Sequence, residues 1–121
     1  MPKFVVHKHH ARTLHYDLRI QTGIRLKSFA IPKGIPPKGK KHLAIYTGTR
    51  SKAALKFEGE IPKGQYGAGK IKIWDTGNFE ILEKTKNKIL CDFKGKKLKG
   101  KYALVKFAQI GEDKWLFFKH K

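Results

Sequence analysis

Apolar and polar residues alternate over short stretches of the chain, and turn-forming residues separate these stretches. Alternation with a period of two, with β-branched and aromatic residues in the apolar positions, is typical of strands that bury one face. No stretch sustains the period of 3.6 of a helix, although residues 51–55 leave room for one helical turn. The pattern predicts nine short strands, at residues 4–6, 14–21, 26–31, 42–47, 70–75, 78–82, 89–93, 102–107 and 115–118.

The segments between these strands contain turn signals of two kinds. Thr22-Gly23 and Thr76-Gly77 predict tight hairpins, because glycine adopts the backbone angles that such turns need. Residues 32–41 hold three prolines and two glycines among lysines and predict a longer exposed loop. Eight or nine strands without crossover helices favour an all-β fold, either an antiparallel barrel or a sandwich. A length of 121 residues predicts one domain, residues 1–121.

The composition of the chain is strongly basic. It has 28 Lys and Arg residues against 9 Asp and Glu residues, which gives a formal net charge of +19. Such a charge repels itself in the compact state and is most simply explained by a polyanionic partner, with nucleic acid as the leading candidate. The alternatives are a solvated surface or the lysine-rich composition of a heat-adapted protein, but an ion-pair network would need more acidic residues as well.

Cysteine usage and hydropathy bear on the cellular location. One cysteine, Cys91, excludes an internal disulfide and a cysteine-based zinc site. No secretory signal, membrane-spanning segment or amphipathic membrane helix is visible in the sequence. These observations predict a cytoplasmic, soluble monomer without a membrane partner.

The stretch HHARTLHYDLRI, residues 9–20, gathers candidate chemical groups on and beside one predicted strand. Because side chains alternate in a strand, one face would carry apolar residues into the core and the other would display polar ones. The apolar face consists of Leu14, Tyr16, Leu18 and Ile20. The polar face consists of His15, Asp17, Arg19 and Gln21.

The polar face predicts a metal site. His15 and Asp17 lie two residues apart and offer a nitrogen and an oxygen ligand side by side, and His9 can return across the preceding turn as a third ligand. Two histidines and one carboxylate suit Mn²⁺, Fe²⁺ or Zn²⁺ and leave coordination positions open. Arg19, further along the same face, has the planar fork that binds a phosphate in two places. A metal beside an arginine is typical of a phosphoester site.

Two other interpretations of this stretch remain open. The polar face of a basic barrel is solvated in many proteins, and Asp17 would then only pair with a neighbouring lysine. The same spacing also fits a non-haem iron oxygenase, which requires another histidine far downstream. Only His42 and His120 are available for that role.

Four blocks of the sequence resemble the 3′-phosphoesterase module of bacterial DNA ligase D and its free-standing archaeal relatives. In chain order they are KHHARTLHYDLRI, LKSFAIPKG, FEGEIPKGQYGAGKIKIWDTG, and KKLKGKYALVKF with WLFFKHK. The resemblance implies a single compact antiparallel β-barrel with a polar surface groove. It also implies metal-dependent removal of a terminal 3′ ribonucleoside and then of the 3′-phosphate, at DNA or RNA–DNA primer ends, in DNA repair and end joining.

The resemblance assigns roles to individual residues. It makes His9, His15 and Asp17 the metal ligands, with Mn²⁺ favoured and Zn²⁺ or another transition metal as the alternative. It places Arg19 on the scissile phosphate, and His7 where relatives commonly carry a glutamine near that phosphate. Basic residues would hold the nucleic acid backbone, with Lys33 beside the groove and further lysines in the following loop, namely Lys38, Lys40 and Lys41. A separate DNA ligase or polymerase would use the product and recruit the protein.

Part of the chain departs from the pattern of the family. Counting back from the FEG block, Arg50 stands where a histidine is expected, Ala54 where a tyrosine is expected, and Gly48 where an acidic residue is expected. Arg50 can neutralise a phosphate, and we count it as a catalytic residue with Arg19 and His7, but its pKa is too high for proton transfer near neutrality. The alternative function is therefore a nucleic-acid-binding member of the family that has lost turnover.

The GQYGAG block is expected to serve the fold. Gly64, Gly67 and Gly69 would permit a tight turn with positive φ angles, and the large side chains of Tyr66 and Trp74 are expected to pack rather than to stack on a substrate.

Overall fold

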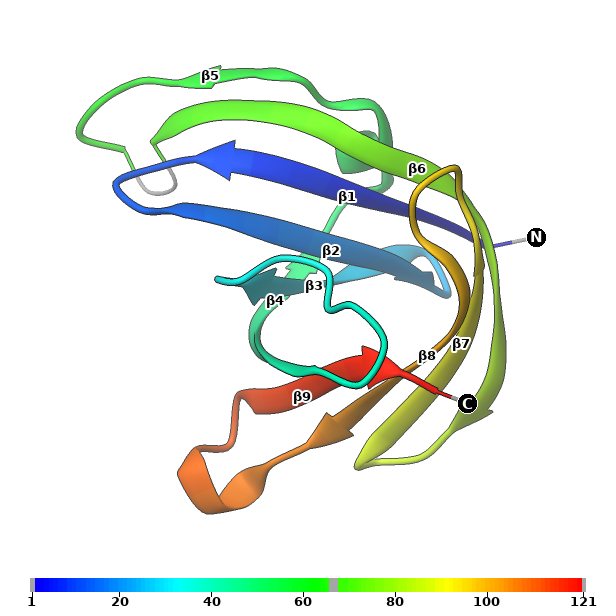
Figure 1. Ribbon diagram of the computed structural model, residues 1–121. Helices are drawn as coiled ribbons and strands as arrows, with labels where there is room; N and C mark the ends of the chain where they lie inside the picture. The colour runs from blue at the N-terminus through cyan, green and yellow to red at the C-terminus, as the bar shows by residue number, and fades with distance from the viewer. Residues whose placement is uncertain (1, 66–67, 121) are drawn as a thin grey trace.

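The computed structural model describes residues 2–65 and 68–120, and these residues form strands and two short 3₁₀ helices (Figure 1). The strands are β1 (Lys3–His10), β2 (Leu14–Thr22), β3 (Arg25–Ile31), β4 (Lys41–Arg50), β5 (Gly59–Ile61), β6 (Gly69–Lys84), β7 (Lys88–Lys94), β8 (Lys99–Lys106) and β9 (Lys114–Lys119). The 3₁₀ helices are η1 (Lys52–Lys56) and η2 (Ala108–Ile110).

Eight of these strands close into an antiparallel barrel. Neighbouring strands follow the order β1-β2-β3-β4-β9-β8-β7-β6, and the pairing of β1 with β6 closes the ring. β5 is an additional strand on the outer edge of β6, where Gly59 pairs with Ile71. The all-β class and the barrel predicted from the sequence are confirmed, and the sandwich alternative is wrong.

The barrel is filled by the apolar face of each strand, as the alternating pattern predicts. Aromatic rings form the centre, where Phe93 contacts the rings of Phe4, Phe79, Tyr102 and Phe117. Leu18 and Ile20 of β2 are 0% exposed within the same cluster. Leu14 does not belong to it, because this residue begins the strand and is 41% exposed.

One predicted hairpin is wrong. Thr76-Gly77 lies inside β6, which runs without a break and curves strongly (Figure 1). Its first part pairs with β1 and its last part with β7. A Cβ atom on Gly77 would lie 2.9 Å from the Lys94 carbonyl oxygen and 3.3 Å from the Phe4 ring. Gly77 is thus required for close packing inside the barrel and not for a turn.

The other turn predictions are confirmed. Gly23 has a φ of 74° in the two-residue connection between β2 and β3. Residues 32–40 form the long loop between β3 and β4, and η1 is the predicted single turn. β5 was not predicted, because three residues are too few to display a period. Among the described residues there is no helix long and apolar enough to cross a membrane.

Candidate metal and phosphate site

The candidate site lies on the face of β1 and β2 that is turned away from the core. In the antiparallel pairing His9 lies opposite His15, and His7 lies opposite Asp17. The segment after β4 lies over this face, since the Phe57 carbonyl contacts His7, and Ile61 and Gln65 line the same pocket as the β2 residues. This segment therefore covers part of the polar face.

The alternation predicted for β2 is confirmed, but its polar face is not a solvated surface. Asp17 is 5% exposed and Arg19 is 9% exposed. The ion pairs of Asp17 are with His9, His15 and Arg19, and none of them is with a lysine. The solvated-face interpretation is therefore wrong for these two residues. The segment after β4 covers them, and the pattern of a single strand carries no information about such tertiary contacts.

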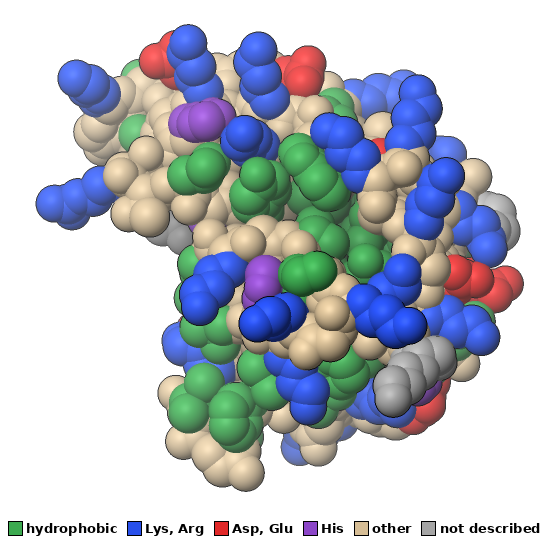
Figure 2. Space-filling view, viewed as in Figure 1, with side chains coloured by type: hydrophobic (Ala, Val, Ile, Leu, Met, Phe, Trp, Pro, Cys, Tyr) green, Lys and Arg blue, Asp and Glu red, His purple; other side chains and the backbone are tan. Residues whose placement is uncertain are grey.

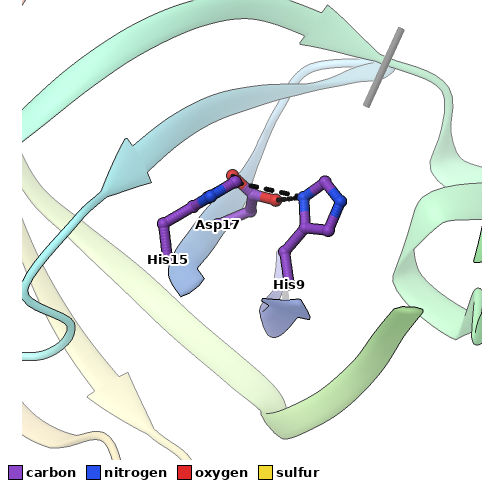
Figure 3. A group of neighbouring side chains, drawn as sticks. All are labelled: His9, His15 and Asp17. Carbon is purple, nitrogen blue, oxygen red and sulfur yellow. Dashed lines mark hydrogen bonds and ion pairs between the residues drawn. The ribbon is translucent and has the colours of Figure 1, made fainter. Parts of the chain in front are cut away.

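Three predicted metal ligands converge at one point (Figure 3). His9 Nδ1 lies 3.1 Å from His15 Nε2 and 3.3 Å from Asp17 Oδ2, and His15 Nε2 lies 3.3 Å from Asp17 Oδ1. One ligand atom from each residue lies within 4.8 Å of the others. Two imidazole nitrogens and one carboxylate at this spacing fit a divalent transition metal. Among the described residues, this is the group of histidine, cysteine and acidic side chains that fits a metal ion.

Neighbouring groups orient the ligands. The Thr13 carbonyl oxygen accepts a hydrogen bond from His15 Nδ1–H over 3.2 Å. This bond orients the ring so that Nε2 faces Asp17. The hydrogen bond with Asp17 raises the pKa of His15 above its usual value. Burial by itself would raise the pKa of Asp17, but the hydrogen bond and charge of His15 and the charge of Arg19 hold it below the usual range. A carboxylate that stays ionised is what a cation site needs.

Three arginines line the pocket, and two of them, Arg19 and Arg50, come from strands β2 and β4. Arg19 Nη2 lies 3.5 Å from Asp17 Oδ2, at the limit of a hydrogen bond. Arg50 Nη1 donates to the carbonyl oxygens of Thr47 and Thr49, each at 3.0 Å. The pocket that contains both guanidinium groups and the three ligands has a volume of about 520 Å³. Positive charge and cation ligands in one cavity suit a phosphate.

A β-bulge aims Arg50 at the pocket. Lys27 pairs with Thr49 and Phe29 pairs with Tyr46, so Thr47 and Gly48 of β4 together face the single residue Ser28 of β3. Gly48 has a φ of 94°, which a side chain would strain, and this explains a glycine at the position where an acidic residue was expected. Bulges commonly redirect a side chain next to an active site, and here the redirected side chain is Arg50.

His7 does not line the pocket. Its ring is 0% exposed, and its Nε2–H donates to the Phe57 carbonyl oxygen over 2.9 Å. Burial, together with the positive charge of Arg19, lowers the pKa of His7 to about 4, so the ring is neutral at pH 7. In the pairing of β1 with β2, His7 lies opposite Asp17.

The predicted nucleic-acid-binding lysines also lie outside this pocket. Lys33 and Lys41 line a separate depression beside His42, and Lys38, Lys40 and Lys41 border Phe118. Figure 2 shows Lys and Arg side chains distributed over the visible face, with few acidic side chains among them. The structure thus brings the three candidate metal ligands, Arg19 and Arg50 to one pocket, whereas the four lysines lie on a separate surface.

Other predicted residues are accounted for as follows. His42 Nδ1 lies 2.7 Å from the Gly34 carbonyl oxygen, and neither His42 nor His120 joins the metal ligands, so the ligand set of the oxygenase interpretation is not formed. Trp74 packs against Tyr16, as expected. Gly64 and Gly69 have positive φ angles of 87° and 125°. Tyr66 and Gly67 lie outside the described residues.

The sequence did not identify three polar residues of the pocket wall. Arg12 comes from the β1–β2 turn, Thr47 from the bulge, and Gln65 from the segment before β6. Arg12 lies inside the HHARTLHYDLRI stretch, and its positive charge could have identified it as a residue of a phosphate site. Thr47 and Gln65 are ordinary polar residues, and only the closure of the barrel and the path of residues 51–65 bring them to the site.

Comparisons with known proteins agree with the geometry. The family model of the DNA ligase D 3′-phosphoesterase domain matches residues 7–106. The multifunctional non-homologous end joining protein LigD of Mycolicibacterium smegmatis is 40% identical over 131 residues, which covers 98% of this chain and 17% of the relative. LigD of Pseudomonas aeruginosa is 36% identical over 129 residues, covering 98% of this chain and 15% of the relative. This sequence therefore corresponds to about a sixth of each relative, and the chain belongs to the DNA ligase D 3′-phosphoesterase domain family.

Proposed function

We propose that this domain is a divalent-metal-dependent phosphoesterase that processes the 3′ ends of DNA or RNA–DNA primer strands during DNA repair. The observation that carries the proposal is the convergence of His9, His15 and Asp17 within 4.8 Å, in a pocket also lined by Arg19 and Arg50. The family membership and the name of the relatives, non-homologous end joining proteins, support the same class of substrate.

The residues of the pocket have complementary tasks in this proposal. His9, His15 and Asp17 would hold the cation, for which we favour Mn²⁺, with Zn²⁺ as the alternative. Such a cation polarises a phosphate oxygen and lowers the pKa of a bound water. Arg19 and Arg50 bind the remaining phosphate oxygens and offset the negative charge that develops in the transition state. Arg50 is already held by two carbonyl oxygens through Nη1, so little reorganisation is needed.

The two activities of the family make different demands on the site. Both release an alkoxide that needs a proton, and Arg50 cannot supply it near neutrality. Release of a 3′ ribonucleoside also needs a 2′-OH held in position, whereas a 3′-phosphate carries a second negative charge that Arg50 can offset. His7 is neutral, and its Nε2–H is bonded to the Phe57 carbonyl, so His7 does not replace the missing proton donor. We therefore propose that 3′-phosphate removal exceeds 3′-ribonucleoside removal in this domain.

The basic surface outside the pocket would hold the strand. We propose that Lys33, Lys38, Lys40 and Lys41 contact the nucleic acid backbone without reading its sequence. A DNA ligase or polymerase would then use the 3′-OH that the reaction leaves.

A second candidate function is binding of 3′ ends without turnover. Arg50 and Ala54 favour it, because the expected histidine and tyrosine are absent from these positions, and Ala54 lies in η1 outside the pocket wall. The double variant Arg50→His with Ala54→Tyr separates the two functions. If turnover is limited by the missing proton donor, the variant raises ribonucleoside release by about tenfold or more.

The deciding experiment is a primer–template with a labelled strand that ends in a 3′-phosphate, incubated with the protein and Mn²⁺ and resolved on a gel. We expect conversion to a 3′-OH end, faster than trimming of a 3′ ribonucleotide. Arg19→Ala should abolish conversion while Mn²⁺ still binds. Binding of the primer with no conversion in the wild-type protein would favour the second candidate function.

A further inference from the structure

Three buried polar side-chain atoms in the described part of the chain have no hydrogen-bond partner, and they lie on the adjacent strands β1, β2 and β3. They are His7 Nδ1, Arg19 Nε and Ser28 Oγ. His7 and Ser28 are 0% exposed and Arg19 is 9% exposed. Buried polar groups are nearly always hydrogen-bonded in native proteins, so an unpaired group calls for a physical explanation. Their clustering beside one pocket points to partners that change when the site is used.

Strand register pairs two of these atoms. Arg19 of β2 and Ser28 of β3 are direct partners across the antiparallel ladder, so their side chains leave the sheet on the same face, with Cβ atoms about 4.5–5.5 Å apart. Arg19 Nε–H is a donor only, whereas a serine hydroxyl accepts as well as donates. His7 is not directly opposite Arg19, because its cross-strand partner is Asp17, two residues along β2. Ser28 Oγ is therefore the acceptor that the register offers to Arg19 Nε–H.

The position of the guanidinium explains why the bond is not already formed. Arg19 Nη2 leans toward Asp17 Oδ2 at 3.5 Å, which is long for a charge-assisted hydrogen bond. Asp17 cannot hold Arg19 and serve as a cation ligand equally well, because both draw on the same carboxylate oxygens. A guanidinium that turns from Asp17 to a bound phosphate keeps its Nε buried, and that Nε–H then needs an acceptor behind it.

We infer that Ser28 is a positioning residue of this site, whose hydroxyl accepts the Arg19 Nε–H when the guanidinium engages a phosphate. The inference deepens the proposed function and rests on it. The Ser28 backbone is itself fixed, since Thr47 Oγ1 donates to the Ser28 carbonyl oxygen over 3.2 Å. Because Thr47 belongs to the bulge that aims Arg50, Ser28 connects the supports of both phosphate-binding arginines.

The test is a titration of inorganic phosphate into the Mn²⁺-loaded protein by calorimetry, with wild type and Ser28→Ala. We expect Ser28→Ala to raise the Kd for phosphate about three- to tenfold, the range of one hydrogen bond, with the Kd for Mn²⁺ unchanged. The Tm should stay the same or rise, because the variant removes a buried hydroxyl that has no partner in the unliganded protein. Ser28→Cys, similar in size with a weak acceptor, should give an intermediate Kd.

Thr76→Ala is the matched control. The Thr76 hydroxyl donates to the Phe4 carbonyl oxygen over 2.8 Å, outside the pocket, so its loss should lower the Tm and leave phosphate affinity unchanged. An unchanged phosphate Kd in Ser28→Ala overturns the inference, and so does a weaker affinity accompanied by a fall in Tm as large as that of the control. If the wild-type protein binds phosphate but does not convert a 3′-phosphate primer, the proposed function is contradicted and the inference about Ser28 is not. The phosphate titration then still decides the role of Ser28.

Discussion

Two buried aspartates, Asp17 on β2 and Asp75 on β6, have nearly equal exposure and different tasks. They are 5% and 6% exposed. Asp75 accepts hydrogen bonds from four backbone N–H groups, those of Thr76, Lys96, Lys97 and Leu98, at 2.7–3.1 Å. The ion-pair partners of Asp17 are side chains, and they lie further away, at 3.3–3.5 Å.

The difference identifies which carboxylate is available for chemistry. The backbone N–H groups cannot move away from Asp75 unless the 95–98 loop unfolds. Both carboxylate oxygens of Asp75 are therefore used in hydrogen bonds that maintain the fold. Histidine and arginine side chains can rearrange around Asp17 when a cation or a phosphate arrives. Burial alone would therefore have been a poor guide to function. The kind of hydrogen-bond partner distinguishes Asp75, which is bound by backbone N–H groups, from Asp17, which is bound by side chains.

The largest effect is expected from removing the charge of the site aspartate. Asp17→Asn should weaken Mn²⁺ binding by more than about a hundredfold. Removing a metal ligand costs more affinity than removing a residue that only hydrogen-bonds to a ligand. Calorimetry on the folded variant, with circular dichroism to verify folding, measures this. Asp75→Asn is the control and should bind Mn²⁺ as wild type does. Equal metal affinity in wild type and Asp17→Asn would remove the distinction between the two aspartates.

The second largest effect is expected on stability, from a substitution of Asp75. Asp75→Asn should lower the free energy of unfolding by about 2–4 kcal/mol, since an amide cannot accept all four N–H groups and leaves buried donors unpaired. Urea unfolding monitored by tryptophan fluorescence gives the value. A loss below about 0.5 kcal/mol would show that the 95–98 loop does not depend on this carboxylate.

A smaller effect concerns acid pH. Burial by itself would raise the pKa of Asp75, but the hydrogen bonds from Leu98, Lys97, Lys96 and Thr76 together hold it below its usual value. A carboxyl whose pKa is lower in the folded state stabilises the fold above the unfolded-state pKa, and this contribution is lost as the pH falls through the folded-state pKa. The stability difference between wild type and Asp75→Asn should therefore narrow below about pH 4. Urea titrations between pH 3 and pH 7 measure this, and a constant difference would contradict it.

The smallest effect is expected on simple binding of nucleic acid by the site variant. The lysine surface lies outside the pocket of the candidate site, so Asp17→Asn should bind a DNA duplex within about twofold of wild type at equal salt. For both proteins the logarithm of the binding constant should fall linearly with the logarithm of salt concentration, by about 0.9 per phosphate contacted. Fluorescence anisotropy at several salt concentrations measures the slopes. A salt-independent affinity would contradict the electrostatic basis of binding.

The sequence by itself determined the parts of this protein that depend on local pattern. Alternation over residues 14–21 placed Leu18 and Ile20 in the core and aligned His15, Asp17 and Arg19 on the other face, because strand side chains alternate whatever the tertiary context. The spacing of His9 to this strand was sufficient to predict that His9, His15 and Asp17 converge, because one tight turn brings His9 opposite His15. The remaining blocks of the motif were sufficient to predict the family.

Only the tertiary structure decided what surrounds these residues. The burial of Asp17 and Arg19 depends on residues 51–65 crossing over β1 and β2, and a period of two carries no information about what covers a face. Thr76-Gly77 has the composition of a hairpin, yet it continues β6, because pairing with β1 on one side and β7 on the other outweighs a local turn preference. The bulge that aims Arg50 and the unpaired Ser28 hydroxyl depend on the register between β3 and β4, which long-range packing fixes.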